Sequence, residues 1–156
     1  MKIPEIIQQL LKLDLETDYD YTIKEHKDKR SLNANAYAWQ LMTKIADVMR
    51  LSKEQVYKSM LRDYGQPEVD SDGKPIIITV RHDIKLLDKE DFYCKFVGNG
   101  EVNDKLFSHY MLLRGSSSYD TKEMAIFIDG IVEEAKQLDI ETLTPDMLME
   151  MKGSWE

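Results

Sequence analysis

The spacing of hydrophobic residues predicts two helices in the first third of the chain. Residues three or four positions apart lie on the same side of a helix, so apolar residues at these intervals mark a face that can be buried. The first dozen residues have this spacing, and so does the segment from Asn33 to Arg50. The expected buried face of the second helix consists of Ala38, Leu41, Met42, Ile45, Val48 and Met49.

A third helix is predicted directly after the second. Ser52 is a favourable N-cap, and Gln55 three positions later completes the pattern of a capping box. Gly65 is a typical residue for the position just after the last helical turn. The sequence therefore predicts a helix between Ser52 and Gly65.

Two more helices are predicted in the last quarter of the chain. Asp120 can cap a helix, with Glu123 three positions later. Thr144 followed by Pro145 indicates the start of a short last helix, because proline is tolerated at the first helical position. The expected buried face of the longer helix consists of Met124, Phe127, Ile128, Ile131, Ala135 and Leu138.

Alternating or β-branched runs predict strands elsewhere. Residues 19–26, "YDYTIKEH", alternate between apolar and polar. An Asp72-Gly73 turn precedes Ile76–Val80, a β-branched run that we expect to form a buried strand. Residues 92–115 predict two strands around the turn-rich run "GNGEVND". The expected fold is one α+β domain over residues 1–156, mainly helical, with a small, largely antiparallel sheet from the middle of the chain.

Length and composition fit a protein without membrane spans. At 156 residues the chain is long enough for one domain with a real core, and 42% of its residues are hydrophobic. No apolar run reaches the roughly 18 residues of a membrane span, and no signal peptide is apparent. The single cysteine, Cys94, rules out an internal disulfide. These features predict a cytoplasmic protein.

The net charge of −8 is unevenly distributed. From Thr22 to Arg62 there are nine Lys or Arg residues and four Asp or Glu residues, whereas from Tyr119 to Glu156 there are three and ten. A cationic segment on an acidic body can meet a polyanion locally while the remainder repels it. Solvent-exposed helix faces are the simpler explanation of the same counts.

The cationic segment also contains amide side chains. Lys27, Lys29 and Arg30 stand ahead of the predicted helix, whose first turn carries Asn33 and Asn35. A helix N-terminus presents free N–H groups and a positive dipole, which favour phosphate. Asparagine side chains can donate to sugar, phosphate or base edges. We therefore regard these five residues as candidate contacts for a nucleic acid.

Two aromatic residues follow on the same helix. Tyr37 or Trp39 offers a stacking face for a base, if the ring is exposed. The alternative is that Ser31 or Asn33 caps the helix and the tryptophan packs in the core. For Trp39 we favour the core.

A second candidate site lies in residues 114–121, "RGSSSYDT". Arg114, Ser116 and Ser117 stand just ahead of a predicted helix N-terminus, where hydroxyls, N–H groups and a guanidinium can bind phosphate. The alternative is a polar loop with a good cap, and this segment considered alone favours it.

The sequence contains no clear catalytic motif. The three histidines fall in different predicted elements, Cys94 lies in an apolar strand, and no G-x-S-x-G or H-E-x-x-H run occurs. Asp70, Asp72 and Asp83 are candidate Mg²⁺ ligands for phosphodiester cleavage. The first two, however, belong to a predicted turn at Gly73, where aspartate is common because its side chain bonds to the nearby backbone. We expect no enzyme activity, metal or cofactor.

Taken together, these runs resemble the NinB family of phage recombination proteins, also called Orf. The resemblance rests on "RSLNAN" at residues 30–35 with Trp39 four positions later, on "GSSSYDTKEM" at 115–124, and on a short last helix with Trp155. Residues 119–148 also resemble the C-terminal part of related proteins from phages and prophages of Gram-positive bacteria. The similarity covers residues 29–50 and 114–155.

The resemblance implies a recombination mediator. Such proteins are dimeric, bind single-stranded DNA and act with single-strand-binding protein to load a recombinase. Two other functions stay open at this point. One is a Mg²⁺-dependent nuclease or resolvase that uses Asp70, Asp72 and Asp83. The other is a protein-binding adaptor that uses its methionine-rich C-terminal helices and binds no DNA.

Overall fold

The computed structural model describes residues 32–153, and the predicted first helix and the strand at 19–26 lie outside this range. The described helices are α2 (Leu32–Met49), α3 (Lys53–Tyr64), α4 (Thr121–Gln137) and α5 (Pro145–Gly153), with short 3₁₀ turns η1 (Leu86–Asp88) and η2 (Ser116–Ser118). The strands are β1 (Ile77–Arg81), β2 (Cys94–Val102) and β3 (Lys105–Leu112). The predicted α+β class, mainly helical with an antiparallel sheet from mid-chain, is confirmed.

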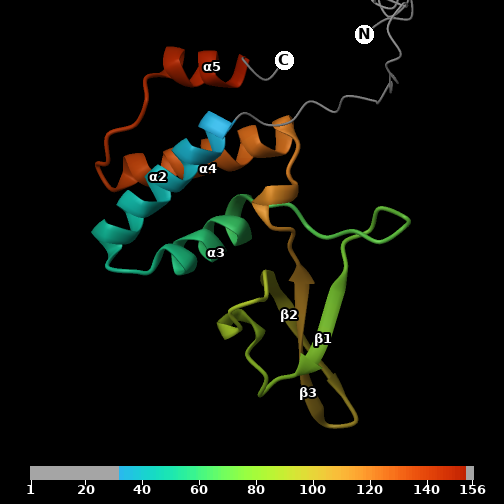
Figure 1. Cartoon of the computed structure of the whole chain (residues 1–156). Coiled ribbons are helices and arrows are strands. Elements are labelled where there is room, and N and C mark those ends of the chain that lie inside the picture. Colours follow the sequence, from blue (N-terminus) through green and yellow to red (C-terminus); the bar gives the residue numbers. More distant parts are fainter. Residues whose placement is uncertain (1–31, 154–156) are drawn as a thin grey trace, which may run out of the picture.

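The helices and the sheet occupy different ends of the molecule (Figure 1). Helices α2, α3 and α4 pack against one another, and α5 lies beside α2. The sheet extends away from this helical layer. The largest fully buried apolar side chains of the helical core are Phe127, Leu41, Met42, Ile45, Leu61, Met124, Ile128, Ile131 and Val56.

The buried face of α2 differs from the prediction in its last turn. Val48 and Met49 are 55% and 53% exposed, so their expected burial was wrong. Ala46 is buried instead. The N–H of Leu51 donates back to the Ala46 carbonyl at 3.0 Å, and Arg50 has a φ of 56°. The chain thus turns away at this point, and the last apolar side chains of α2 stay outside the helical packing.

The predicted helix starts are confirmed by their hydrogen bonds. The Ser52 hydroxyl accepts from the Gln55 N–H at 3.1 Å, and the Gln55 side chain accepts from the Ser52 N–H at 2.9 Å. Asp120 and Glu123 form the same reciprocal pair at the start of α4. The Thr144 hydroxyl accepts an N–H from the first turn of α5. These caps satisfy donors that a helix start otherwise leaves unpaired.

Gly65 ends α3 as predicted. Glycine often stands at this position because it adopts a left-handed backbone, but that is not the reason here. Its φ is −81° and its ψ is 176°, which is an extended conformation. A Cβ at this position would lie 2.9 Å from the Leu61 carbonyl carbon and closer still to the carbonyl oxygen. Glycine is therefore required by close approach to the preceding helical turn.

The sheet has the strand order β1-β3-β2, and both pairs are antiparallel. Exposed and half-buried residues alternate along β1, so the expectation that residues 76–80 form a buried strand was wrong. A β-branched run cannot by itself distinguish a strand buried on both faces from a strand covered on one. Here η1 packs against one face of the sheet.

The turn between β2 and β3 is tighter than the predicted "GNGEVND" loop. Most of that run belongs to β2, which contains an irregularity between Phe96 and Gly98. Only Asn103 and Asp104 form the turn, with φ values of 51° and 59°. Two consecutive left-handed residues match the right-handed twist of a two-residue hairpin.

A second, smaller core lies on the covered face of the sheet. Leu86 of η1 packs there with Cys94 and Tyr110. Half-buried apolar side chains surround these three: Ile78, Val80, Leu87, Phe92 and Leu112. Burial raises the pKa of the Cys94 thiol, which disfavours the reactive thiolate.

Tyr64 joins the end of α3 to α4. Its hydroxyl donates to the Glu134 carboxylate at 2.6 Å, and its ring lies against Gly130. This hydrogen bond, together with burial, raises the pKa of Tyr64 to about 12, because the carboxylate favours the protonated phenol.

The raised pKa predicts a pH effect. Below pH 10, the usual pKa of tyrosine, the phenol is protonated in both folded and unfolded chains, so the hydrogen bond contributes fully. Its contribution is lost as the pH rises to about 12. In an ultraviolet titration, Tyr64→Phe should remove a transition near pH 12 from the wild-type curve. If the titration curve of the variant matched that of the wild type near pH 12, the raised pKa of Tyr64 would be contradicted.

Candidate nucleic-acid interface

The predicted contacts ahead of α2 are only partly within the described chain. Lys27, Lys29 and Arg30 lie outside it. The helix begins at Leu32, close to the predicted start at Asn33, and its first turn contains no acidic residue. Asn35 is half-buried. The described structure therefore provides a helix N-terminus immediately after the basic run, as the sequence predicts.

The two aromatic side chains of α2 are engaged within the fold. Trp39 is half-buried against the helical core, and its ring centroid lies 4.9 Å from that of Tyr57. The tryptophan therefore packs against the core, as expected, although its side chain is not fully buried. The Tyr37 hydroxyl accepts from the Leu143 N–H at 2.9 Å.

Arg114 contacts neighbouring side chains of its own segment. Its guanidinium forms an ion pair with Glu123, and both side chains are about a quarter exposed, at 26% and 25%. The guanidinium carbon also lies 5.5 Å from the centroid of the Tyr119 ring. These contacts fit a structural role for Arg114 beside the capping box of α4.

The two serines of the second candidate site have different environments. Ser116 is only 4% exposed, its N–H donates to the Tyr57 hydroxyl at 2.8 Å, and the two hydroxyls lie 3.0 Å apart. Ser117 is exposed. Of these two hydroxyls, therefore, only that of Ser117 is open to a ligand without a change in the loop.

Two of the three candidate metal ligands, Asp70 and Asp83, are engaged in other contacts. One Asp70 oxygen accepts from the N–H groups of Asp72 and Lys74, at 2.8 and 3.0 Å. Asp83 pairs with Arg81, and the hydrogen bond from the guanidinium lowers the pKa of that carboxyl. Within residues 32–153, no group of three His, Cys, Asp or Glu side chains is placed to hold a metal ion.

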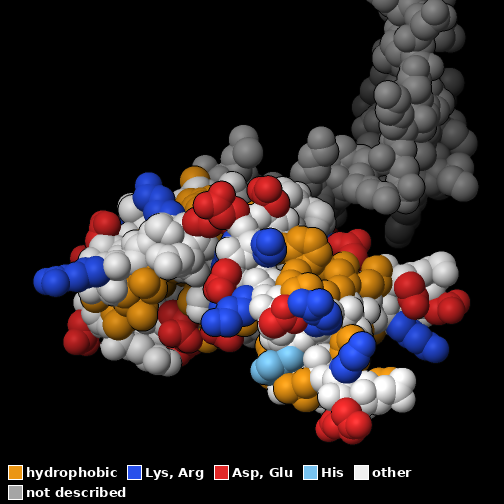
Figure 2. Space-filling model, turned by 90° about the horizontal axis from the view of Figure 1, so that it is seen from below, with side chains coloured by type: hydrophobic (Ala, Val, Ile, Leu, Met, Phe, Trp, Pro, Cys, Tyr) orange, Lys and Arg blue, Asp and Glu red, His pale blue; other side chains and the backbone are white. Residues whose placement is uncertain are grey.

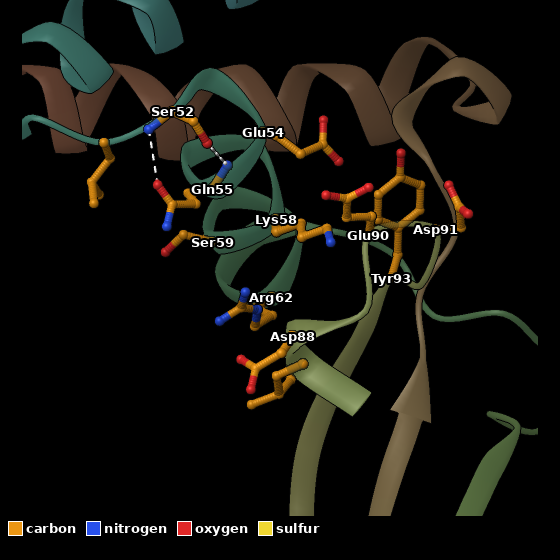
Figure 3. Close-up of a pocket in the computed structure, with 12 residues that line it drawn as sticks. Ser52, Glu54, Gln55, Lys58, Ser59, Arg62, Asp88, Glu90, Asp91 and Tyr93 are labelled. Atoms are coloured by element: carbon orange, nitrogen blue, oxygen red, sulfur yellow. Dashed lines mark hydrogen bonds between the residues drawn. The ribbon is translucent and has the colours of Figure 1, made fainter. Parts of the chain in front are cut away.

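A cleft of about 1030 Å³ lies between α3 and the segment that contains η1 (Figure 3). Lys58 and Arg62 line it from α3, with Glu90 and Tyr93 opposite. The Lys58 ammonium donates to the Lys89 carbonyl at 2.6 Å. Acidic side chains outnumber basic ones along the cleft, which makes it a poor site for a polyanion.

A basic surface that the sequence analysis missed lies on the sheet. The face opposite the Leu86–Cys94–Tyr110 core carries Arg81, Lys95, Lys105, Phe107 and His109, and is called here the outer sheet face. At this end of the molecule, basic, hydrophobic and histidine side chains lie close together, with acidic side chains among them (Figure 2). Side-chain alternation predicts which residues of one strand share a face. Only the register of the three strands shows that these residues lie on the same face of the sheet.

Comparisons with protein-family models, with curated proteins and with solved structures gave no match. Within residues 32–153, no helix is long and apolar enough to cross a membrane. The function proposed below therefore rests on the residues of this chain and on the motif similarity described above.

Proposed function

We propose that this protein is a phage or prophage recombination mediator that binds single-stranded DNA. It acts in the host cytoplasm as a homodimer, together with single-strand-binding protein, and assists loading of a recombinase. The role requires phosphate contacts and strand retention, and it requires no nucleophile, metal or cofactor.

One observation carries the proposal: a helix starts at Leu32 directly after a basic run. Its first turn lacks acidic side chains, so nothing on the helix itself opposes an anion at the positive end of the dipole. Lys27, Lys29 and Arg30 precede this end in the sequence, and Asn33 and Asn35 lie within it. Backbone N–H groups, amides and cations together form a suitable set of phosphate donors.

The rest of the chain explains why binding should be local and sensitive to salt. The net charge is −8, so most of the surface repels a nucleic acid. Affinity for a single strand then depends on the few cations that displace counterions, and it falls steeply as salt rises. From the second candidate site we retain Ser117 as a direct contact. Arg114 can contact the DNA only if a phosphate displaces Glu123 from its guanidinium. Ser116 can do so only if its loop opens, because its side chain is buried.

The proposal predicts a specific defect for Lys29→Ala combined with Arg30→Ala. Loss of two phosphate contacts should weaken binding of a labelled oligothymidine roughly tenfold at 50 mM salt. It should also flatten the slope of log affinity against log salt by about 1.4, because each phosphate contact to a single strand contributes about 0.7. Fluorescence anisotropy over a salt series measures both quantities.

A matched control removes the same charge from the helical layer. Lys44 and Lys136 are exposed, and replacing both by alanine changes the net charge equally. This variant should bind almost as well as the wild type. Equal isotherms for all three proteins would remove the proposed site ahead of α2.

A protein-binding adaptor is the second candidate, favoured by exposed apolar side chains on the last two helices. Ile126, Met147 and Met149 are 54%, 52% and 69% exposed. Methionine-bearing surfaces adapt well to partner proteins. Failure of the wild type to bind any nucleic acid at low salt, with tight binding to a host replication protein, would favour this function.

A further inference from the structure

The outer sheet face is uncovered in the described structure. Residues two apart on a strand share a face, and Ile78, Val80 and Tyr110 pack toward η1. Their neighbours therefore point the other way. Ile77, which pairs with Met111 on this opposite face, is 46% exposed, and Val102 near the hairpin end is 61% exposed.

The charged strand residues on this face have one sign. Arg81, Lys95 and Lys105 come from three different strands, and the register places them on the same side. None of the strand residues on this side is Asp or Glu. Asp83, just beyond β1, pairs with Arg81, but the two side chains are 71% and 62% exposed. Such an exposed pair is weak, so a phosphate can compete for the guanidinium.

Rings and open backbone lie between these cations. Phe107 pairs with Gly100 on β2 and with Arg81 on β1, so an aromatic ring sits in the middle of the face. The His109 ring is fixed by a 2.8 Å hydrogen bond between its Nδ1 and the Thr79 hydroxyl. A Cβ added at Gly98 would meet nothing within 4 Å, so a ligand can approach the backbone there.

The dimensions also suit an extended strand. Six positions along β3 separate Lys105 from Met111, the cross-strand partner of Lys95. This separation corresponds to roughly 20 Å, because a strand rises about 3.3 Å per residue. A hollow of about 570 Å³ lies at the Lys105 end, lined in part by Arg81 and Phe107.

We propose that the outer sheet face binds single-stranded nucleic acid, with Arg81, Lys95 and Lys105 at phosphates and Phe107 under a base. Cations alone would suit a duplex equally well. The half-exposed apolar and aromatic side chains between them, however, can stack only with bases that are unpaired, which favours a single strand. The inference rests on the function proposed above and adds a surface separate from the residues ahead of α2.

The test removes the three cations without shortening the side chains strongly. Arg81→Gln, Lys95→Gln and Lys105→Gln are combined, and binding of a labelled oligothymidine is measured by anisotropy from 50 to about 300 mM salt. Affinity at the lowest salt should fall at least tenfold. The salt slope should flatten by about 2, because each phosphate contact to a single strand contributes about 0.7. A matched control replaces Lys44, Lys53 and Lys136, which are exposed on the helices, by glutamine.

Phe107→Leu supplies a second test with little risk to the fold, because Phe107 is half-buried and leucine remains apolar. Removing a base-stacking ring should weaken binding at least about fivefold while leaving the salt slope unchanged. In the wild type, a bromouracil-substituted oligonucleotide irradiated in the ultraviolet should cross-link to a peptide from β3. Cross-links confined to other segments would contradict the proposal.

The outcomes separate the inference from the proposed function. If the wild type binds single strands and the sheet variant matches its control, the outer sheet face is not a binding surface, although the proposed function stands. If the wild type binds no single strand at 50 mM salt, both fail. If the sheet variant instead changes the sedimentation coefficient and leaves DNA binding intact, the face is an interface between two copies, and the inference is overturned.

Discussion

Replacing Phe127 by alanine should lower the free energy of unfolding by about 3–5 kcal/mol. The side chain is fully buried, and its ring meets Tyr119 edge-on at a centroid distance of 5.7 Å. A second edge-on contact joins it to Tyr57 at 6.4 Å. Truncation would leave a cavity between α4 and the α3 side of the core. Urea denaturation followed by circular dichroism measures the effect, which is a large share of the roughly 5–15 kcal/mol that stabilises a typical domain.

The preceding residue offers a matched control. Ile126 lies on the same helix but is 54% exposed, so Ile126→Ala should change the unfolding free energy by less than about 0.5 kcal/mol. Similar losses for the two variants would show that the helical layer does not pack around Phe127 as described.

Alanine at Gly130 should destabilise the protein by about 1–3 kcal/mol, although alanine normally favours a helix interior over glycine. The added Cβ would lie 2.5 Å from Cδ2 of Tyr64 and closer still to Cγ and Cδ1. These atoms belong to the inner part of the ring, so the side chain cannot simply swing its tip away. Thermal and urea denaturation of the variant measure the loss.

A double-mutant cycle isolates this contact. In a Tyr64→Ala background the obstructing ring is gone, so Gly130→Ala should be neutral or stabilising by up to about 1 kcal/mol. The difference between the two backgrounds is the cost of the overlap. Stabilisation by Gly130→Ala in the wild-type background would contradict the close approach of α3 to α4.

The helices were predictable because their signals are local. The capping box at Ser52 and Gln55, and the one at Asp120 and Glu123, join residues three positions apart, and both form as expected. The apolar stripe of α4 is likewise a local pattern, and it is buried up to Ala135, with Leu138 half-buried. Such features need no knowledge of the tertiary structure.

Features that depend on distant partners were not predictable. Whether Val48 is buried depends on where the next helix packs, and whether the run at 76–80 is buried depends on what covers the sheet. From the sequence, Ser116 was expected to have an open hydroxyl. Its partner Tyr57 is 59 positions away, so no local pattern reveals the contact. Similarly, Arg81, Lys95 and Lys105 come onto one face of the sheet only through strand register, so no short sequence motif marks the outer sheet face.

The hydrogen bond from the Leu143 N–H to the Tyr37 hydroxyl spans 106 positions and links the approach to α5 with the beginning of α2. Deleting the chain after α4 would remove that donor and loosen the helix end beside the proposed DNA contacts. Reduced DNA affinity of such a shortened protein would therefore not show that the deleted segment contacts DNA. For the same reason, a purification handle attached after α5 is better joined through a long flexible linker than fused directly.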